Sequence, residues 1–190
     1  MPVLNDDKEL SRLLSEILVV CDDSAEIIVV DGSDSRVTRE LSARDQVKYV
    51  QSPPSRGAQI SEGISVANGK IIWIIHADSR QLTEPLRRLR AMANDSKLCW
   101  GRFDVSMESL KLIPFMMNLR SRLTKICTGD QGMFFSSLLL GMIGGFPNLP
   151  LMEDIELSRQ LKMVKDAKFY AFRDRLIASE RKWIRNGILR

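Results

Sequence analysis

The sequence of 190 residues is expected to form one domain of the doubly wound α/β class. Two short apolar runs, 26–31 and 71–75, are rich in β-branched residues, which is typical of strands covered on both faces of a parallel sheet. Segments with the apolar spacing of helices alternate with such runs, and this alternation implies right-handed crossovers. A chain of this length buries a core without disulfides or structural metal.

Each element of the first half is indicated by a local pattern. The start, Met1 to Asn5, has the pattern of the end of a strand whose earlier residues are absent, so we expect a truncated first strand. Leucine and isoleucine recur at helical spacing after Asp7, and Asn68-Gly69 is expected to end a later helix in the left-handed conformation. In chain order the elements after the first strand are helix 7–20, strand 26–31, helix 36–43, strand 47–51, helix 58–67 and strand 71–75.

The second half is less regular. A polar loop at 128–131 separates a methionine-rich helical region from a short apolar strand. The last helix places Leu157, Leu161 and Val164 on one face. The expected elements are strand 98–105, helix 112–126, strand 133–136 and helix 153–164.

The composition argues against some classes of partner but does not identify the function. The net charge of +4 and pI near 9.1 suit nucleic acid, an anionic membrane surface or a phosphorylated small molecule equally. An aromatic content of 6% and the lack of a clustered Lys/Arg stripe argue against nucleic acid. Three scattered cysteines, Cys21, Cys99 and Cys127, predict neither disulfides nor a zinc site and fit the reducing cytoplasm. No stretch of 18 apolar residues is present, so peripheral contact with a membrane stays open.

Polar side chains follow two of the predicted strands. Asp31 ends one strand, and His76 and Asp78 follow the other at alternate positions that share one side. Ligands of α/β sheets bind beyond the carboxyl ends of the strands, and carboxylate with imidazole suits manganese or magnesium. The alternative is that these acids cap the next helix and that His76 is a structural histidine.

Three further groups carry candidate chemistry. Arg56 begins a helix, where free N–H groups favour phosphate, although no P-loop spacing is present. Three acids at the start of the last helix, Glu153, Asp154 and Glu156, include a candidate general base or simply complement the helix dipole. Arg181 with Trp183 suits a diphosphate or a sugar, or is a surface edge with one packed tryptophan.

Taken together, the segments resemble the family-2 glycosyltransferases with the GT-A fold, over essentially the whole chain. Within that family the sequence is most similar to a bacterial branch associated with arsenosugar biosynthesis. The matching segments are 2–5, 26–33, 56–59, 76–78, 100–103, 118–122, 128–131, 144–147 and 151–158.

The resemblance implies an inverting transfer of a hexose or pentose from a nucleoside diphosphate sugar to an acceptor hydroxyl. It also implies a nucleotide-binding half, 1–80, and an acceptor-side half, 98–190, and a cytoplasmic enzyme that attaches to the inner face of the membrane or stays free of it. The residue roles that it implies are Asp154 as catalytic base, Asp31, Arg56, Asp78, Arg181 and Trp183 at the donor, Trp100, Asp130 and Glu153 on the acceptor side, and Asp78 with His76 at a Mn²⁺ or Mg²⁺ ion.

The sequence departs from the family pattern at three points. His76 replaces the first aspartate of the metal-binding D-x-D element, the turn 31–35 is shorter than the usual glycine-rich version, and the first strand lacks its start. A GT-A-like domain that binds a nucleotide sugar without turnover is therefore the alternative. The sequence does not specify the donor sugar, the acceptor or the oligomeric state.

Overall fold

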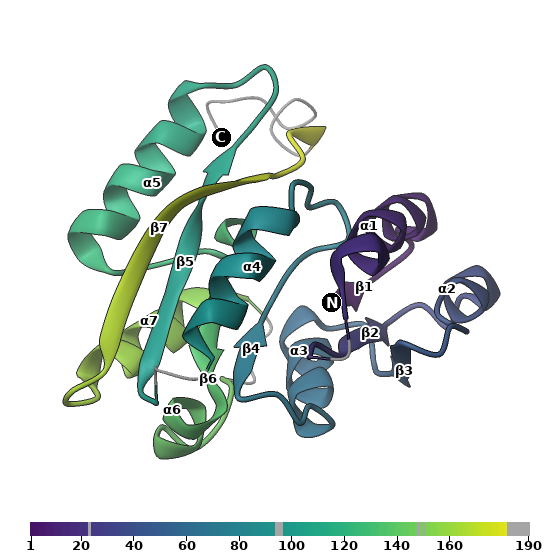
Figure 1. The fold of residues 1–190 in the computed structure, drawn as a ribbon, viewed down its shortest axis with the longest axis horizontal. Coiled ribbons are helices and arrows are strands. Elements are labelled where there is room, and N and C mark those ends of the chain that lie inside the picture. The colour runs from purple at the N-terminus through teal and green to yellow at the C-terminus, as the bar shows by residue number, and fades with distance from the viewer. Residues whose placement is uncertain (23, 94–96, 148, 150, 182–190) are drawn as a thin grey trace.

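The fold is taken from a computed structural model that describes residues 1–22, 24–93, 97–147, 149 and 151–181. Its strands form two sheets with helices on both faces (Figure 1). Three of the strand pairs are parallel and two are antiparallel, so the expectation of an α/β fold with a mostly parallel sheet is confirmed. Within these ranges, no helix is long and apolar enough to cross a bilayer.

The first sheet is wholly parallel, in the order β1-β2-β3. Its first strand is only two residues long, as the sequence predicts. Helices alternate with these strands along the chain. The bounds are β1 (Pro2–Val3), α1 (Asp7–Val20), β2 (Ile27–Asp31), α2 (Arg36–Leu41), β3 (Val47–Gln51) and α3 (Arg56–Ser65).

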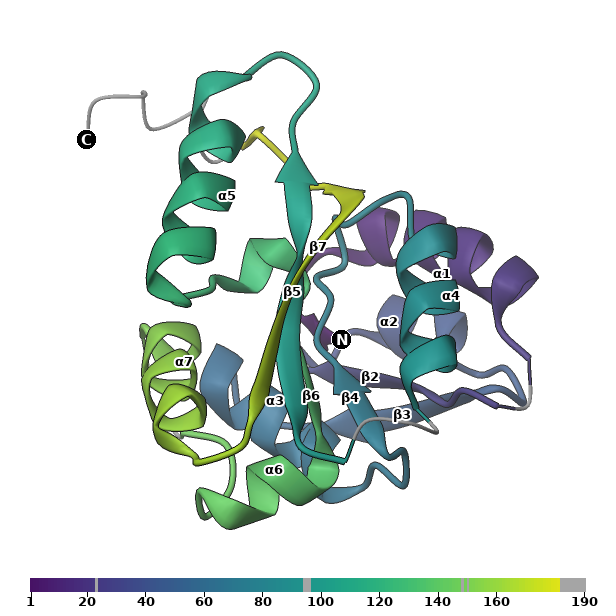
Figure 2. The ribbon, with the colours of Figure 1, turned by 60° about the vertical axis from the view of Figure 1, so that its left-hand side comes forward.

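The second sheet has the order β4-β6-β5-β7, and β6 runs antiparallel to both of its neighbours. Figure 2 shows α5 on the outer side of this sheet, beside β5. The bounds are β4 (Ile71–Trp73), α4 (Thr83–Met92), β5 (Cys99–Ser106), α5 (Leu112–Thr124), the 3₁₀ turn η1 (Gly129–Gln131), β6 (Phe134–Ser136), α6 (Ser137–Met142), α7 (Glu153–Met163) and β7 (Lys168–Ile177).

The core has two parts because successive strand residues point to opposite faces. Phe134 packs with α1 and α4, whereas its neighbour Phe135 packs with α3, α6 and α7. Ile75 and Ile74 divide between the two parts in the same way. The strands after which the site residues follow are thus held from both sides.

Three elements were not predicted, namely α4, α6 and β7. Only Pro85, Leu86 and Leu89 of α4 are buried, and β7 is mostly half-buried. The expectation that Asn68 and Gly69 end α3 in the left-handed conformation was wrong. Neither Asn68 nor Gly69 has a positive φ, and both donate backbone N–H groups to the Glu26 carboxylate, at 2.5 and 2.9 Å.

Candidate active site

Asp31 lies at the end of β2 with its carboxylate turned into the following loop. Oδ1 accepts hydrogen bonds from the backbone N–H and hydroxyl of Ser33, at 2.8 and 2.6 Å, and Oδ2 accepts from Ser35 N–H and Tyr49 OH. The residue is fully buried. In this structure the carboxylate shapes the loop after β2.

Arg56 joins α3 to the start of α7. Its Nε donates to Glu153 Oε1 at 2.5 Å and its Nη2 to Asp154 Oδ2 at 3.2 Å. The Glu153 side chain is only 3% exposed and the Asp154 side chain 14%, whereas the Arg56 side chain is 41% exposed. One guanidinium therefore balances two acids that are 97 and 98 residues away in sequence.

Asp154 is held by backbone groups as well. Its Oδ2 accepts the Gly129 N–H at 2.8 Å, and its Oδ1 accepts the Ile155 N–H at 2.8 Å. Together with Arg56, three donors fill three of the roughly four acceptor positions of a carboxylate. One acceptor position is left for a proton from outside the protein.

His76 adjoins this group across Gly129. A Cβ at Gly129 would lie 2.7 Å from His76 Nε2 and 2.8 Å from Arg56 Nη2, so only glycine allows this approach. His76 Nε2 is buried and has no hydrogen-bond partner. Burial and then the Arg56 guanidinium lower the pKa of His76, while Asp130 and Asp78 act in the opposite direction. The imidazole is therefore neutral near pH 7, the form that binds metal.

Asp78 lies in a second cluster of charges. Arg181 Nη2 is 3.7 Å from Asp78 Oδ2 and 3.6 Å from Asp6 Oδ1, and Arg181 Nη1 is 3.8 Å from Glu9 Oε1. The pKa of Asp6 is raised, chiefly by burial, and Arg181 offsets only part of this rise. These pairs are long and Arg181 is exposed, so they contribute little stability and open readily to a ligand.

The remaining predicted residues fall in three places. Asp130 lies in η1, close enough to act on the charge of His76. Trp100 is buried in β5 with its ring 4.7 Å from that of Phe169, so its side chain offers no surface to an acceptor. Trp183 lies outside the described residues.

A buried polar network that the sequence did not reveal supports η1. Gln131 Nε2 donates to Asn118 Oδ1 and Ser121 Oγ, at 3.2 and 3.0 Å. Asn118 in turn exchanges hydrogen bonds with the backbone of Val105, and the buried Arg102 donates to the Asn118 carbonyl at 3.0 Å. The network fixes the Gly129 N–H that Asp154 accepts.

A metal bound by the described part of the chain would need ligands from outside it. Among the described residues, no three His, Cys, Asp or Glu side chains gather closely enough to hold an ion. The orphaned Nε2 of His76 and the half-exposed Asp78 fit an ion that takes its other ligands from a bound phosphate, as magnesium commonly does.

The architecture is that of the GT-A glycosyltransferases. The structure is similar to residues 1–349 of TarS from S. aureus, with a TM-score of 0.75 and 16% identity over 97% of this chain and 60% of that chain. It is also similar to the mannosyltransferase PcManGT from Pyrobaculum calidifontis in complex with GDP-Man and Mn²⁺, with a TM-score of 0.73 and 18% identity over 95% of this chain and 56% of that chain. The chain thus spans about 60% of their length or less.

A family model assigns the chain within this class. The model described as glycosyl transferase family 2 matches residues 1–139, and the chain belongs to this family. TarS 1–349 in complex with UDP-GlcNAc is a further similar structure, with a TM-score of 0.68 and 17% identity over 90% of this chain and 57% of that chain. No curated protein matches the sequence.

Proposed function

We propose that the protein transfers a sugar, a hexose or a pentose, from a nucleoside diphosphate sugar to an acceptor hydroxyl, with inversion at the anomeric carbon. The observation that carries the proposal is the Asp154 carboxylate, oriented by Arg56 and the Gly129 N–H with one acceptor position left. Similar structures were solved with UDP-GlcNAc and with GDP-Man, which supports a donor of this class.

Asp154 is the proposed general base. The acceptor oxygen forms a bond to the anomeric carbon while the bond from that carbon to the diphosphate oxygen breaks. The electron pair leaves with the diphosphate, and the hydroxyl proton passes to Asp154. Arg56 serves two needs, since it keeps the buried Glu153 paired and holds Asp154 in place.

The donor is proposed to bind along the strand ends, near Asp31, Arg56, Asp78 and Arg181, with Trp183 in the same role. Mn²⁺ or Mg²⁺ would be held by Asp78 and His76, and when bound it neutralises charge on the departing diphosphate. Arg181 would then exchange its carboxylate partners for phosphate, which arginine binds well. Glu153 and Asp130 are proposed on the acceptor side.

A matched pair of variants tests the base. Asp154→Asn should lower the release of nucleoside diphosphate by roughly 10²- to 10⁴-fold while donor binding persists. Glu156→Gln is the control, because this acid of the same helix turn contacts Gln160 and Arg159 instead. Wild-type turnover by Asp154→Asn would contradict the assignment. No diphosphate release by the wild-type protein with any acceptor would favour the alternative, a domain that binds the donor without turnover.

Peripheral membrane contact is part of the proposal, with α5 as its site. One side of α5 is exposed and apolar, and Lys111 and Lys125 lie at its two ends. Such a helix suits an anionic lipid surface. Leu123→Glu should abolish sedimentation with anionic vesicles, and equal sedimentation would refute this part. The apolar residues are Leu112, Phe115, Met116, Leu119 and Leu123.

Two narrower assignments rest on the sequence. The arsenosugar-associated branch rests on the resemblance alone, and the cytoplasmic location rests also on the three scattered cysteines. Assay of acceptors that contain arsenic, beside simple sugar alcohols, tests the branch.

A further inference from the structure

Three exposed apolar side chains lie directly before the acids at the start of α7. They belong to Leu149, Leu151 and Met152, and together they are called the apolar lip here. Leu151 and Met152 are 71% and 56% exposed. A single exposed leucine is ordinary on a protein surface. Several exposed apolar side chains at adjacent positions, two residues from the candidate base Asp154, instead indicate a surface that binds a ligand.

The lip is held in place by α3. A Cβ at Gly57 would lie 2.4 Å from the Leu149 carbonyl oxygen, so the chain crosses α3 at a point where only glycine fits. The neighbouring Arg56 bonds to Glu153 and Asp154 at the other end of the lip. The lip is therefore fixed to the start of α3 at one end and to the start of α7 at the other, and these contacts set its distance from the base.

Met152 has an unusual backbone conformation for its residue type. It is the residue before α7 and lies in the left-handed region, with a φ of 62° and a ψ of 24°. Side chains larger than asparagine rarely adopt this region. Such conformations persist only where surrounding contacts hold them, and they gather at binding sites. A methionine at this position presents a flexible apolar side chain that adapts to the shape of a hydrocarbon group.

The charges beside the lip determine what it binds. Glu153 is the only residue between the lip and Asp154 along the chain, and its buried carboxylate is already paired with Arg56. A charged ligand group on the lip would gain no partner there, whereas a hydrocarbon group would cover it. A protein seated on the lip would obstruct the approach to Asp154, which has one acceptor position left. The occupant that fits is therefore the acceptor.

We propose that the apolar lip binds a hydrocarbon group of the acceptor, so that the acceptor is an amphiphilic alcohol with an alkyl or aromatic group beside its reacting hydroxyl. The inference rests on the proposed function, in which Asp154 takes the hydroxyl proton. The hydroxyl is directed to Asp154 while the hydrocarbon covers Leu151 and Met152. This cover is the same before and during the reaction, so it lowers KM and leaves kcat unchanged.

A series of acceptors tests the effect on turnover. The acceptors are β-D-glucosides that carry a methyl, butyl, hexyl or octyl group, used below the concentration at which they form micelles. The donor is UDP-GlcNAc or GDP-Man with Mn²⁺. The value of kcat/KM for diphosphate release should rise roughly twofold to fourfold with each added methylene, which corresponds to partial to full burial of that group. Equal kcat/KM along the series would overturn the proposal.

A matched pair of variants locates the effect on the lip. Asparagine tolerates the left-handed conformation, so Met152→Asn keeps the turn and removes the apolar side chain. Combined with Leu151→Ser, it should raise KM for octyl glucoside at least tenfold and leave KM for methyl glucoside unchanged. Met163→Asn is the control, because this methionine is exposed at the other end of α7. An equal rise of KM in the control would contradict the assignment.

Methionine methyl NMR gives a readout that does not depend on turnover. Octyl glucoside with UDP should shift the methyl resonance of Met152, which is assigned by its loss in Met152→Asn, and should leave that of Met163 in place. A shift of Met116 in α5 in place of Met152 would put the hydrocarbon on α5 and overturn the proposal. Unshifted resonances would also overturn it. A shift of Met152 without diphosphate release from any acceptor would support binding on the lip and count against the proposed turnover alone.

Discussion

The buried amino group of Met1 makes the stability of the fold depend on pH. Burial lowers the pKa of this group from 8.0 to about 5. Between these values the unfolded chain holds more protons than the folded chain, so stability rises with pH there and falls as the pH drops. The difference between 8.0 and about 5, at about 1.36 kcal/mol per pKa unit, corresponds to roughly 4 kcal/mol. The loss levels off once the pH lies well below the folded value of about 5.

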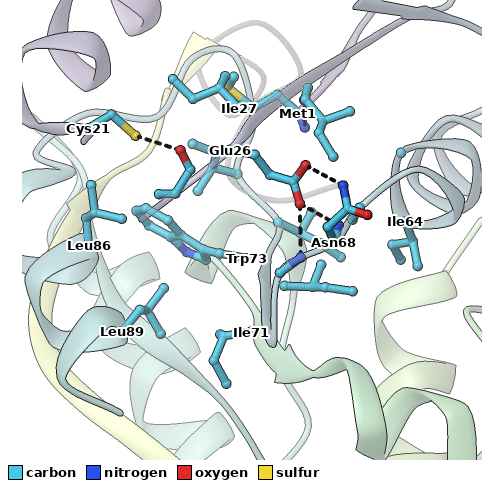
Figure 3. A pocket seen from close by; sticks show the side chains of 18 of the residues that line it. Met1, Cys21, Glu26, Ile27, Ile64, Asn68, Ile71, Trp73, Leu86 and Leu89 are labelled. Carbon is cyan, nitrogen blue, oxygen red and sulfur yellow. Dashed lines mark hydrogen bonds between the residues drawn. The ribbon is translucent and has the colours of Figure 1, made fainter. Parts of the chain in front are cut away.

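Selective Nα-acetylation isolates the effect, because an amide does not titrate. The cavity beside Met1, between β2 and β4, has a volume of about 490 Å³ and therefore has room for the acetyl group (Figure 3). The charged side chains that line the same cavity, Glu26, Lys70 and Arg90, are present in both proteins. Urea unfolding is measured from pH 5 to pH 8.5 on protein that retains Met1, as verified by mass spectrometry. The stability difference between the two proteins should grow from near zero at pH 8.5 to roughly 4 kcal/mol at pH 5. Parallel pH profiles would refute a buried amino group.

Three further outcomes follow from the packing. Gly129→Ala should lower turnover roughly tenfold to a hundredfold, because the new Cβ would lie 2.7 Å from His76 Nε2. Gly141→Ala is the control, since its Cβ meets no atom within 4 Å, and it should keep full activity. Equal turnover by the two variants would contradict the close approach of His76 to Gly129. Arg102→Met should reduce the free energy of unfolding in urea by about 2–4 kcal/mol, and a loss below about 1 kcal/mol would mean that the buried guanidinium is dispensable. Burial raises the pKa of Cys127 to about 12, so a thiol reagent at pH 8 should label half-buried Cys21 first, and equal native labelling would contradict this burial.

The parts of the fold that depend on local pattern were predictable. Helix α1 was predicted with its observed bounds because Leu10, Leu13, Leu14 and Ile17 form one buried stripe. Strand β7 was missed because its order comes from pairing with β5, some 70 residues earlier in the chain. Local periodicity carries no information about such a partner.

The candidate site was likewise predictable only in part. Strand ends and helix starts identified Arg56 and His76, and the family resemblance singled out Asp154 among three acids. The structure brings these three residues together around Gly129. The Gly129 N–H and the network of Asn118 and Gln131 were missed, because a backbone donor and a buried amide leave no pattern in composition or spacing. Trp100 was expected on the acceptor side, but its side chain is buried in the core. The sequence around an aromatic residue beside a glycine does not show whether that residue faces a ligand or the core.

The central claim is that the strand-end residues bind a nucleoside diphosphate together with a divalent ion. Its most direct test is a thermal-shift titration of UDP and GDP, with and without Mn²⁺, on the wild-type protein and on Asp78→Asn. We expect one nucleotide to stabilise the wild-type protein only with Mn²⁺, by about 2.7 kcal/mol at a hundredfold excess over Kd, and Asp78→Asn to lose this gain. No stabilisation by either nucleotide, or an equal gain in Asp78→Asn, would contradict it.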